Sequence, residues 1–247
     1  MTVPRFPIAF AGGQVALAVR AGPGTDLPRA LRAMGLTTGV PAIVAVSAGS
    51  RPGQLSRLGP LVRKVLVKVA EAVEATVVDE GDAAGVGALL GDARRRAKAG
   101  FPLVGVAPDA ADPSRLDAEH THYVFVPGDG GRQVARWVAE VTSAVAGGNR
   151  SVALVAAGGE PAWESVAAHV EAGRLVMAVA RSGGVADQLA AALAGRAGDG
   201  RARALTGSGQ VCAVDPGRGA THVADTLRSA LSRPDALGPG PPLPPRR

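Results

Sequence analysis

Glycine-rich loops with small polar or acidic residues recur along the chain, and each directly follows a short apolar run. They read "SAGSRPG" after Val46, "DEGDAAGVG" after Val78, "PGDGG" after Val126, "AGGEP" after Ala156 and "RSGGVAD" after Ala180. Glycine allows positive φ angles and a close approach of the backbone to a bound group, and free N–H groups at helix starts favour anions. The recurrence therefore predicts a site for a phosphate-bearing ligand.

The candidate ligand-binding residues are glycines, hydroxyls and carboxylates of these five loops. They are Gly49, Ser50, Gly81, Asp82, Gly85, Gly128, Asp129, Gly158, Gly159, Glu160, Ser182, Gly183 and Asp187. Glu160 and Asp187 have two interpretations, because a carboxylate near a helix start can cap the first turn or accept a hydrogen bond from a ribose hydroxyl. One such loop is explained by a strand-to-helix turn. Five in one chain favour a nucleotide-like ligand.

Established phosphate-binding and catalytic motifs do not occur in these loops. None matches GxGxxG or GxxxxGK[ST], and the chain has no GxSxG nucleophile motif. His120 and His122 could share a metal with Glu119, but their alternation before a strand favours a structural hydrogen-bonding pair. The single cysteine, Cys212, excludes a disulfide or a cysteine metal site within the chain. We therefore expect no metal, no cofactor and no catalytic residue.

Buried strands alternating with helices must position these loops. Apolar runs predict strands at residues 42–46, 76–79, 102–106, 123–126, 152–156 and 174–180, with a further strand at 211–214. This alternation is typical of an α/β three-layer sandwich with a mostly parallel sheet, whose ligands bind beyond the carboxyl ends of the strands. The loops should therefore gather along one edge of the sheet.

Apolar residues three and four apart predict helices over 58–73, 134–145 and 163–170. Trp137 and Trp163 lie on the apolar stripes of the last two, so we expect both in the core. Residues 6–19 predict a β-hairpin around Gly12-Gly13. We expect one domain over residues 1–232, followed by a disordered or polyproline-like tail over 233–247, which is mostly proline and glycine.

Composition narrows the classes of partner. The chain has 247 residues and a formal net charge of +6, but its arginines are scattered and aromatic residues make up only 3%. Without a basic face interleaved with aromatic side chains, nucleic-acid binding is disfavoured. There is no signal-peptide core and no uncharged apolar run long enough to span a bilayer. We expect a cytoplasmic protein with no membrane partner, and leave a homo-oligomeric state open.

The motifs, in their order, resemble the prokaryotic LSDAT family. This family is related to the N-terminal ligand-sensing domain of melastatin-type TRP channels and belongs to the SLOG superfamily. The resemblance covers roughly Phe6 to Val214 and is carried by "VVDEGDAAGVGALLGDA", "PLVGVAP", "EHTHYVFVPGD", "ALVAAGGE" and "RSGGVADQLAAAL". It implies a cytoplasmic Rossmann-like domain that binds a nucleotide or a nucleotide-derived ligand similar to ADP-ribose or NAD.

Two departures from the family pattern bear on the ligand. The usual Asp-Gly-Gly-Thr is replaced by Asp79-Glu80-Gly81-Asp82, and an arginine, Arg181, replaces the first glycine of Gly-Ser-Gly-Arg-x-Ala-Asp. Two added carboxylates would repel a phosphate by about 1 kcal/mol per close contact in a solvated site. Glu80 and Arg181 could instead face each other and pair.

The leading hypothesis is non-catalytic binding or sensing of a nucleotide-derived small molecule. The first alternative is a nucleoside-monophosphate phosphoribohydrolase of the LOG type, for which only Asp79, Asp82, Glu160 and Asp187 are candidate acids or bases. The Pro-Gly-Gly-x-Gly-Thr-x-x-Glu motif of those enzymes is missing from the chain. The second alternative is a protein-interaction module whose pocket has degenerated.

Overall fold

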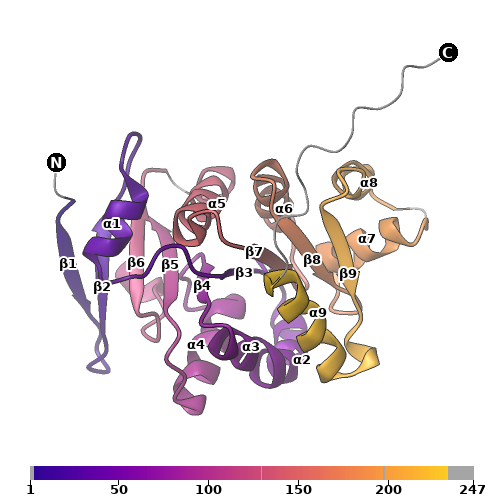
Figure 1. Ribbon diagram of the computed structural model, residues 1–247, viewed down its shortest axis with the longest axis horizontal. Coiled ribbons are helices and arrows are strands. Elements are labelled where there is room, and N and C mark those ends of the chain that lie inside the picture. The colour runs from indigo at the N-terminus through magenta and orange to yellow at the C-terminus, as the bar shows by residue number, and fades with distance from the viewer. Residues whose placement is uncertain (1–2, 129, 197, 233–247) are drawn as a thin grey trace.

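A computed structural model describes residues 3–128, 130–196 and 198–232 (Figure 1). One nine-stranded sheet runs through the molecule, with helices on both of its faces. The candidate residue Asp129 and the tail over 233–247 lie outside the described residues. The expected α/β sandwich with a mostly parallel sheet is thereby confirmed.

The strand order in the sheet is β1-β2-β6-β5-β4-β3-β7-β8-β9. The strands are β1 (Arg5–Ala9), β2 (Val15–Arg20), β3 (Ala42–Val46), β4 (Thr76–Asp79), β5 (Leu103–Pro108), β6 (His122–Val126), β7 (Ser151–Val155), β8 (Leu175–Val179) and β9 (Val211–Val214). Among the strands of the described residues, only β1 and β2 pair antiparallel, with Pro7 opposite Leu17, which confirms the expected N-terminal hairpin. The hairpin extends the sheet by pairing β2 parallel to β6.

The helices divide between the two faces of the sheet. One face is covered by α1 (Leu27–Ala33), α5 (Arg132–Ala146), α6 (Ala162–Glu171), α7 (Gly184–Leu193) and α8 (Gly200–Thr206). The other is covered by α2 (Pro52–Leu61), α3 (Val67–Ala72), α4 (Gly85–Ala97) and α9 (Ala220–Ser232), as Figure 1 shows. Short 3₁₀ segments lie at Pro113–Arg115 and Pro216–Arg218.

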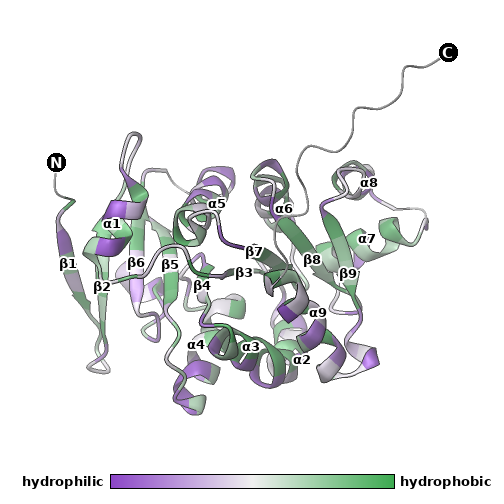
Figure 2. Cartoon of the chain, in the orientation of Figure 1, coloured by the Kyte–Doolittle hydropathy of each residue, from purple (hydrophilic) through white to green (hydrophobic). Residues whose placement is uncertain are grey.

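The central strands are buried on both faces. All five residues of β3 are buried, and its side chains alternate between the two core clusters, with Val44 and Val46 on one face and Ile43 and Ala45 on the other. The apolar colouring of the sheet in Figure 2 follows this burial. Continuous apolar runs are needed here because helices exclude water from both faces.

The helix expected over 58–73 is interrupted. Pro60 lies inside α2 and has no N–H to donate, and a π-helical turn over Val62–Leu66 separates α2 from α3. The apolar side is still buried across the interruption, at Leu58, Val65 and Val69. Among the tryptophans, Trp163 is buried as expected, whereas Trp137 is only partly buried.

The order in which the chain adds strands to the sheet reverses at β3. From β3 the chain moves outward through β4, β5 and β6, and then returns to place β7 on the other side of β3. The connections leaving β3 and β7 therefore diverge to opposite sides. In open parallel sheets such a switch point creates a crevice beyond the carboxyl ends of the strands.

Candidate functional site

A cavity of about 250 Å³ lies beyond the carboxyl ends of β3 and β4. Two loops supply its walls. The lining residues are Ala45, Ser47, Ala48, Gly49, Ser50, Asp79, Glu80, Gly81, Asp82, Ala84, Gly85, Val86 and Gly87. Five of the candidate residues from the sequence meet here: Gly49, Ser50, Gly81, Asp82 and Gly85.

Two serines join the loops around the cavity. Helix α4 begins at Gly85 without a side-chain cap from its own N-cap residue, and Ser47 Oγ instead accepts a hydrogen bond from Val86 N at 3.0 Å. Ser50 Oγ accepts from Gly158 N at 2.9 Å. Neither hydroxyl donates to a protein group within the described part of the chain, so both can donate to a ligand.

The cavity is acidic. Glu80 is open to solvent but flanked by protein, and Ser165 Oγ on α6 donates to its Oε1 at 3.4 Å. Desolvation raises the pKa of Glu80, and the adjacent Asp79 carboxylate raises it further. Asp82 lies 3.6 Å from Arg115 and also accepts from Ala84 N at 3.0 Å. No lysine, arginine or histidine lines the cavity among the described residues.

A buried chain of charged groups lies behind the cavity. His120 is 2% exposed, with Nε2 at 2.8 Å from Asp79 Oδ1 and Nδ1 at 2.9 Å from Asp117 Oδ2. Burial alone would lower the pKa of His120, but the two carboxylates outweigh it and raise the pKa to about 9. The Tyr123 hydroxyl shares its single hydrogen between the carbonyl oxygens of Gly81, at 2.9 Å, and Asp117, at 2.8 Å. These bonds fix the Asp79 loop from beneath.

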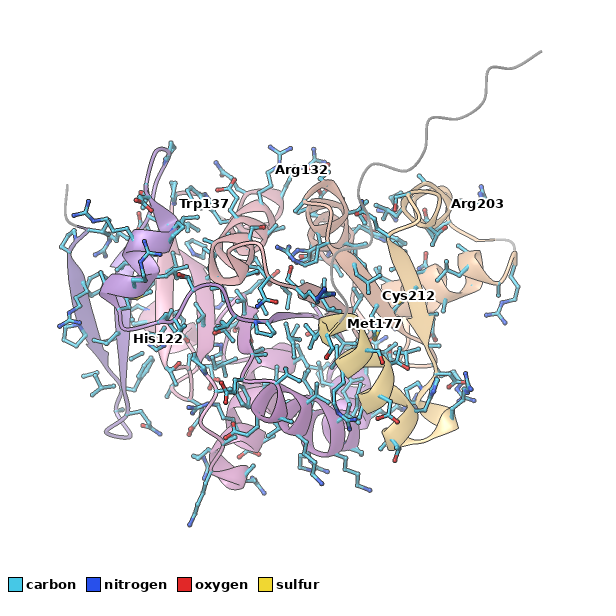
Figure 3. The ribbon with its side chains drawn as sticks, in the orientation of Figure 1. His122, Arg132, Trp137, Met177, Arg203 and Cys212 are labelled. Atoms are coloured by element: carbon cyan, nitrogen blue, oxygen red, sulfur yellow. The ribbon has the colours of Figure 1, made fainter. Side chains whose placement is uncertain are left out.

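The two histidines of "EHTHY" have separate structural roles. His122, labelled in Figure 3, pairs with Thr121 Oγ1 at 2.8 Å and lies 3.3 Å from Met34 O, whereas both ring nitrogens of His120 pair with carboxylates. Across residues 3–128, 130–196 and 198–232, no group of three or more histidine, cysteine, aspartate or glutamate side chains is arranged so that it could hold a metal ion.

The double glycine after β7 packs against the β3 loop. The amides of Ala157, Gly158 and Gly159 donate to Ser182 Oγ, Ser50 Oγ and Ala48 O at 2.8, 2.9 and 2.8 Å. A Cβ atom at Gly159 would lie 2.4 Å from Gly49 O. The glycines therefore allow close backbone packing, and their amides are already used within the protein.

The remaining candidate residues lie around or away from the cavity. Ser182 is buried and donates to Val179 O at 2.6 Å, and a Cβ at the neighbouring Gly183 would meet Gln54. Asp187 lies in the first turn of α7, with Oδ1 buried and unpartnered among the described residues. Glu160 is 76% exposed and pairs with Arg201. Gly128 follows β6, which β5 separates from β4.

The suggested pairing of Glu80 with Arg181 does not occur. Arg181 forms an ion pair with Asp215 at the end of β9, and Glu80 contacts Ser165 instead. The two side chains belong to the loops of β4 and β8, and β3 and β7 lie between these strands. Arg181 therefore does not neutralise the cavity.

Sequence reasoning did not select Ser47, Gly87 or His120 for the site. Ser47 directly follows β3 and Gly87 belongs to the "GVG" after β4, so both lie within the quoted loops and could have been included. His120 carried no such signal, because its contact with Asp79 spans 41 residues of sequence.

The sheet order, with its switch point at β3 and a cavity beyond β3 and β4, defines a Rossmann-like α/β domain. The family model described as "SLOG in TRPM, prokaryote" matches residues 40–224. The chain belongs to this prokaryotic LSDAT family.

The chain is also similar to the X-ray structure of TM1055, a structural genomics target. The two share 17% sequence identity with a TM-score of 0.50, over 76% of this chain and 98% of the other. This likeness concerns the fold alone. No curated protein matches the chain. Within the described residues, no helix is long and apolar enough to cross a membrane.

Proposed function

We propose that this domain binds a nucleotide or nucleotide-derived ligand, without catalysing a reaction, in the cavity beyond β3 and β4. The observation that carries the proposal is the position of the cavity, beyond the carboxyl end of β3, where the strand order reverses, and against the first turn of α4. Helix starts at such positions present N–H groups and the positive end of the helix dipole.

The lining residues divide into donors and acceptors. The Ser47 and Ser50 hydroxyls can donate hydrogen bonds, and Glu80 and Asp82 can accept them. The volume of about 250 Å³ is below the range of about 300–1,000 Å³ typical of sites for drug-sized ligands. The cavity therefore suits one part of a nucleotide, with the rest of the ligand along its rim.

The phosphoribohydrolase alternative has one observation in its favour. Glu80 lies in the cavity and its pKa is raised, which is the direction that favours a general acid. An enzyme of this class would release free base from a nucleoside monophosphate. The protein-interaction alternative requires no small-molecule ligand at all.

Thermal-shift measurements with ADP-ribose, NAD, AMP and cyclic nucleotides test the proposal, with chromatography of each mixture for free base. We expect at least one nucleotide to raise the melting temperature without turnover, because a ligand that binds only the folded state stabilises it. Release of free base would support the hydrolase instead. No shift across the panel would overturn ligand binding.

A pair of neighbouring substitutions locates the site. Ala84 lines the cavity, is exposed and has extended backbone angles, so Ala84→Phe should fill the cavity without backbone strain. Ala83 is also exposed but does not line the cavity, which makes Ala83→Phe the matched control. We expect Ala84→Phe to abolish the ligand-induced shift and Ala83→Phe to retain it. Equal shifts in both variants would place the ligand elsewhere.

A further inference from the structure

We infer that Asp79 is the residue that selects the ligand, by accepting a hydrogen bond from a hydroxyl of a ribose vicinal diol in the cavity. The inference rests on the proposed function and specifies which part of the nucleotide enters. It assigns the sugar to the acidic interior and the phosphates to the rim, beside the Ser50 hydroxyl.

The two carboxylate oxygens of Asp79 have different surroundings. Oδ1 accepts from Gly81 N at 2.6 Å and is 2.8 Å from His120 Nε2. Oδ2 is buried and has no hydrogen-bond partner among the described residues. Buried carboxylate oxygens are usually satisfied, so an unpartnered one at the wall of a cavity points to a missing donor. A ligand hydroxyl would supply that donor.

Asp79 Oδ2 lies against Gly87 at the edge of the cavity. Both Asp79 and Gly87 line it, and a Cβ atom at Gly87 would lie 2.6 Å from Oδ2 but 3.4 Å from Oδ1. One turn further along α4, a Cβ at Gly91 would lie 2.6 Å from Asp117 Oδ2. The two glycines thus leave room on one face of α4 for the carboxylates that flank His120.

The surrounding charges favour a sugar over a phosphate in this position. Asp79, Glu80 and Asp82 line the cavity and none of its described lining residues is cationic, so a phosphate placed among them would be repelled. Hydroxyl groups instead gain charge-assisted hydrogen bonds. The position in the sheet agrees, because an acid after the second strand of a Rossmann-type unit accepts from a ribose hydroxyl, and β4 directly follows β3 in chain and sheet.

His120 is a positioning residue in this arrangement. Its imidazole contacts Asp79 Oδ1 and is anchored at the other ring nitrogen by Asp117, so it fixes the rotation of the Asp79 carboxylate. With Oδ1 held by His120 and Gly81 N, Oδ2 is the oxygen of Asp79 that is left for a ligand.

The Asp79→Asn variant tests the inference by reversing one hydrogen bond. The two donors at Oδ1 would hold the amide oxygen in that place, and the NH₂ group would take the position of Oδ2. We would measure the affinities of AMP and 2′,3′-dideoxy-AMP by calorimetry. The wild type should prefer AMP by roughly tenfold to a hundredfold, as expected for a hydrogen bond to a charged group. Asp79→Asn should bind both nucleotides equally weakly.

A second pair of variants keeps the test valid if Asp79→Asn does not fold. Gly87→Ala retains the carboxylate but places a methyl group 2.6 Å from the present position of Oδ2, so this oxygen must move and the preference for AMP should be lost. Ala83→Phe, at an exposed residue that does not line the cavity, is the control and should retain it.

The outcomes separate the two proposals. Equal affinities of the wild type for AMP and its dideoxy analogue, or a preference that survives Gly87→Ala, would overturn the role of Asp79 alone. AMP is the smallest panel member with both a phosphate and a free vicinal diol, so its failure to bind would also overturn that role. Failure of every nucleotide in the panel would overturn the proposed function as well.

Discussion

His120 lies in the interior between two carboxylates, and this gives the protein a specific dependence on pH. Its pKa is about 9 in the folded state against 6.5 for the ordinary side chain. A group whose pKa is raised by folding stabilises the folded state. This stabilisation is fully present below the pKa of the unfolded state and is lost as the pH rises through the pKa of the folded state. The relevant window is therefore between pH 6.5 and 9.

We expect the free energy of unfolding to fall across this window, by up to about 3 kcal/mol. Urea unfolding at successive pH values would measure it, and the His120→Gln variant should lose most of the slope. His122 and His169 have lowered pKa values, and their unfolded forms lose their remaining protons just above pH 6.5, so they add little to the slope over most of the window. If the free energy of unfolding of the wild type rose between pH 6.5 and 9, His120 would not be a protonated partner of the two carboxylates.

Arg174 connects secondary-structure elements on one side of the sheet. It is buried, and its guanidinium donates to Ser151 Oγ on β7 at 2.8 Å and to Ser143 Oγ on α5 at 2.8 Å. It also lies 2.6 Å from His169 Nδ1 on α6. Within the described residues it has no carboxylate partner, but it follows the C-terminal end of α6, where the helix dipole favours a cation.

Replacing Arg174 should therefore loosen the packing of α5 and α6 on the sheet. We expect Arg174→Met, which keeps most of the apolar stem, to lower the free energy of unfolding by about 3 kcal/mol, because several buried polar groups lose their partner. Arg203, labelled in Figure 3, is exposed and donates to Gly198 O, so Arg203→Met is the control and should change stability by less than about 0.5 kcal/mol. Equal effects in urea unfolding would contradict the connecting role of Arg174.

The strands β1 to β9 form one continuous sheet. Its two core clusters lie on opposite faces and share β3, β4, β7 and β8, so neither can be lost without the other. We therefore expect residues 1–232 to behave as a single folding unit.

Calorimetry of a chain ending at Ser232 tests this expectation. The removed residues 233–247 are mostly proline and glycine, a composition that builds no packed core. The truncated and full-length chains should show one transition each, at the same melting temperature within about 2 °C. Two separate transitions, or a large fall in melting temperature on truncation, would contradict the domain assignment.

Much of the fold could be predicted because its signals are local. Buried parallel strands require continuous apolar runs, and runs such as "AIVAV" and "VALVA" gave β3 and β7 nearly to the residue. The interruption of the helix at Pro60 was missed, because the apolar spacing continues through the π turn. The glycine loops also followed from sequence, since each directly follows a strand.

The sequence alone thus determined the family, the sheet and the loops at its carboxyl edge. Only the tertiary structure decided what each loop does there. Gly158 and Gly159 resemble an anion cradle in sequence, but their amides donate to Ser50 and Ala48 once the β3 and β7 loops meet. From the sequence, Asp79 is only the last residue of a strand. In the structure His120, far along the chain, contacts one of its oxygens, and the other has no partner among the described residues. Whether a hydrogen-bonding group is available to a ligand depends on which distant residues folding brings next to it. The residues adjacent to it in the sequence do not determine this.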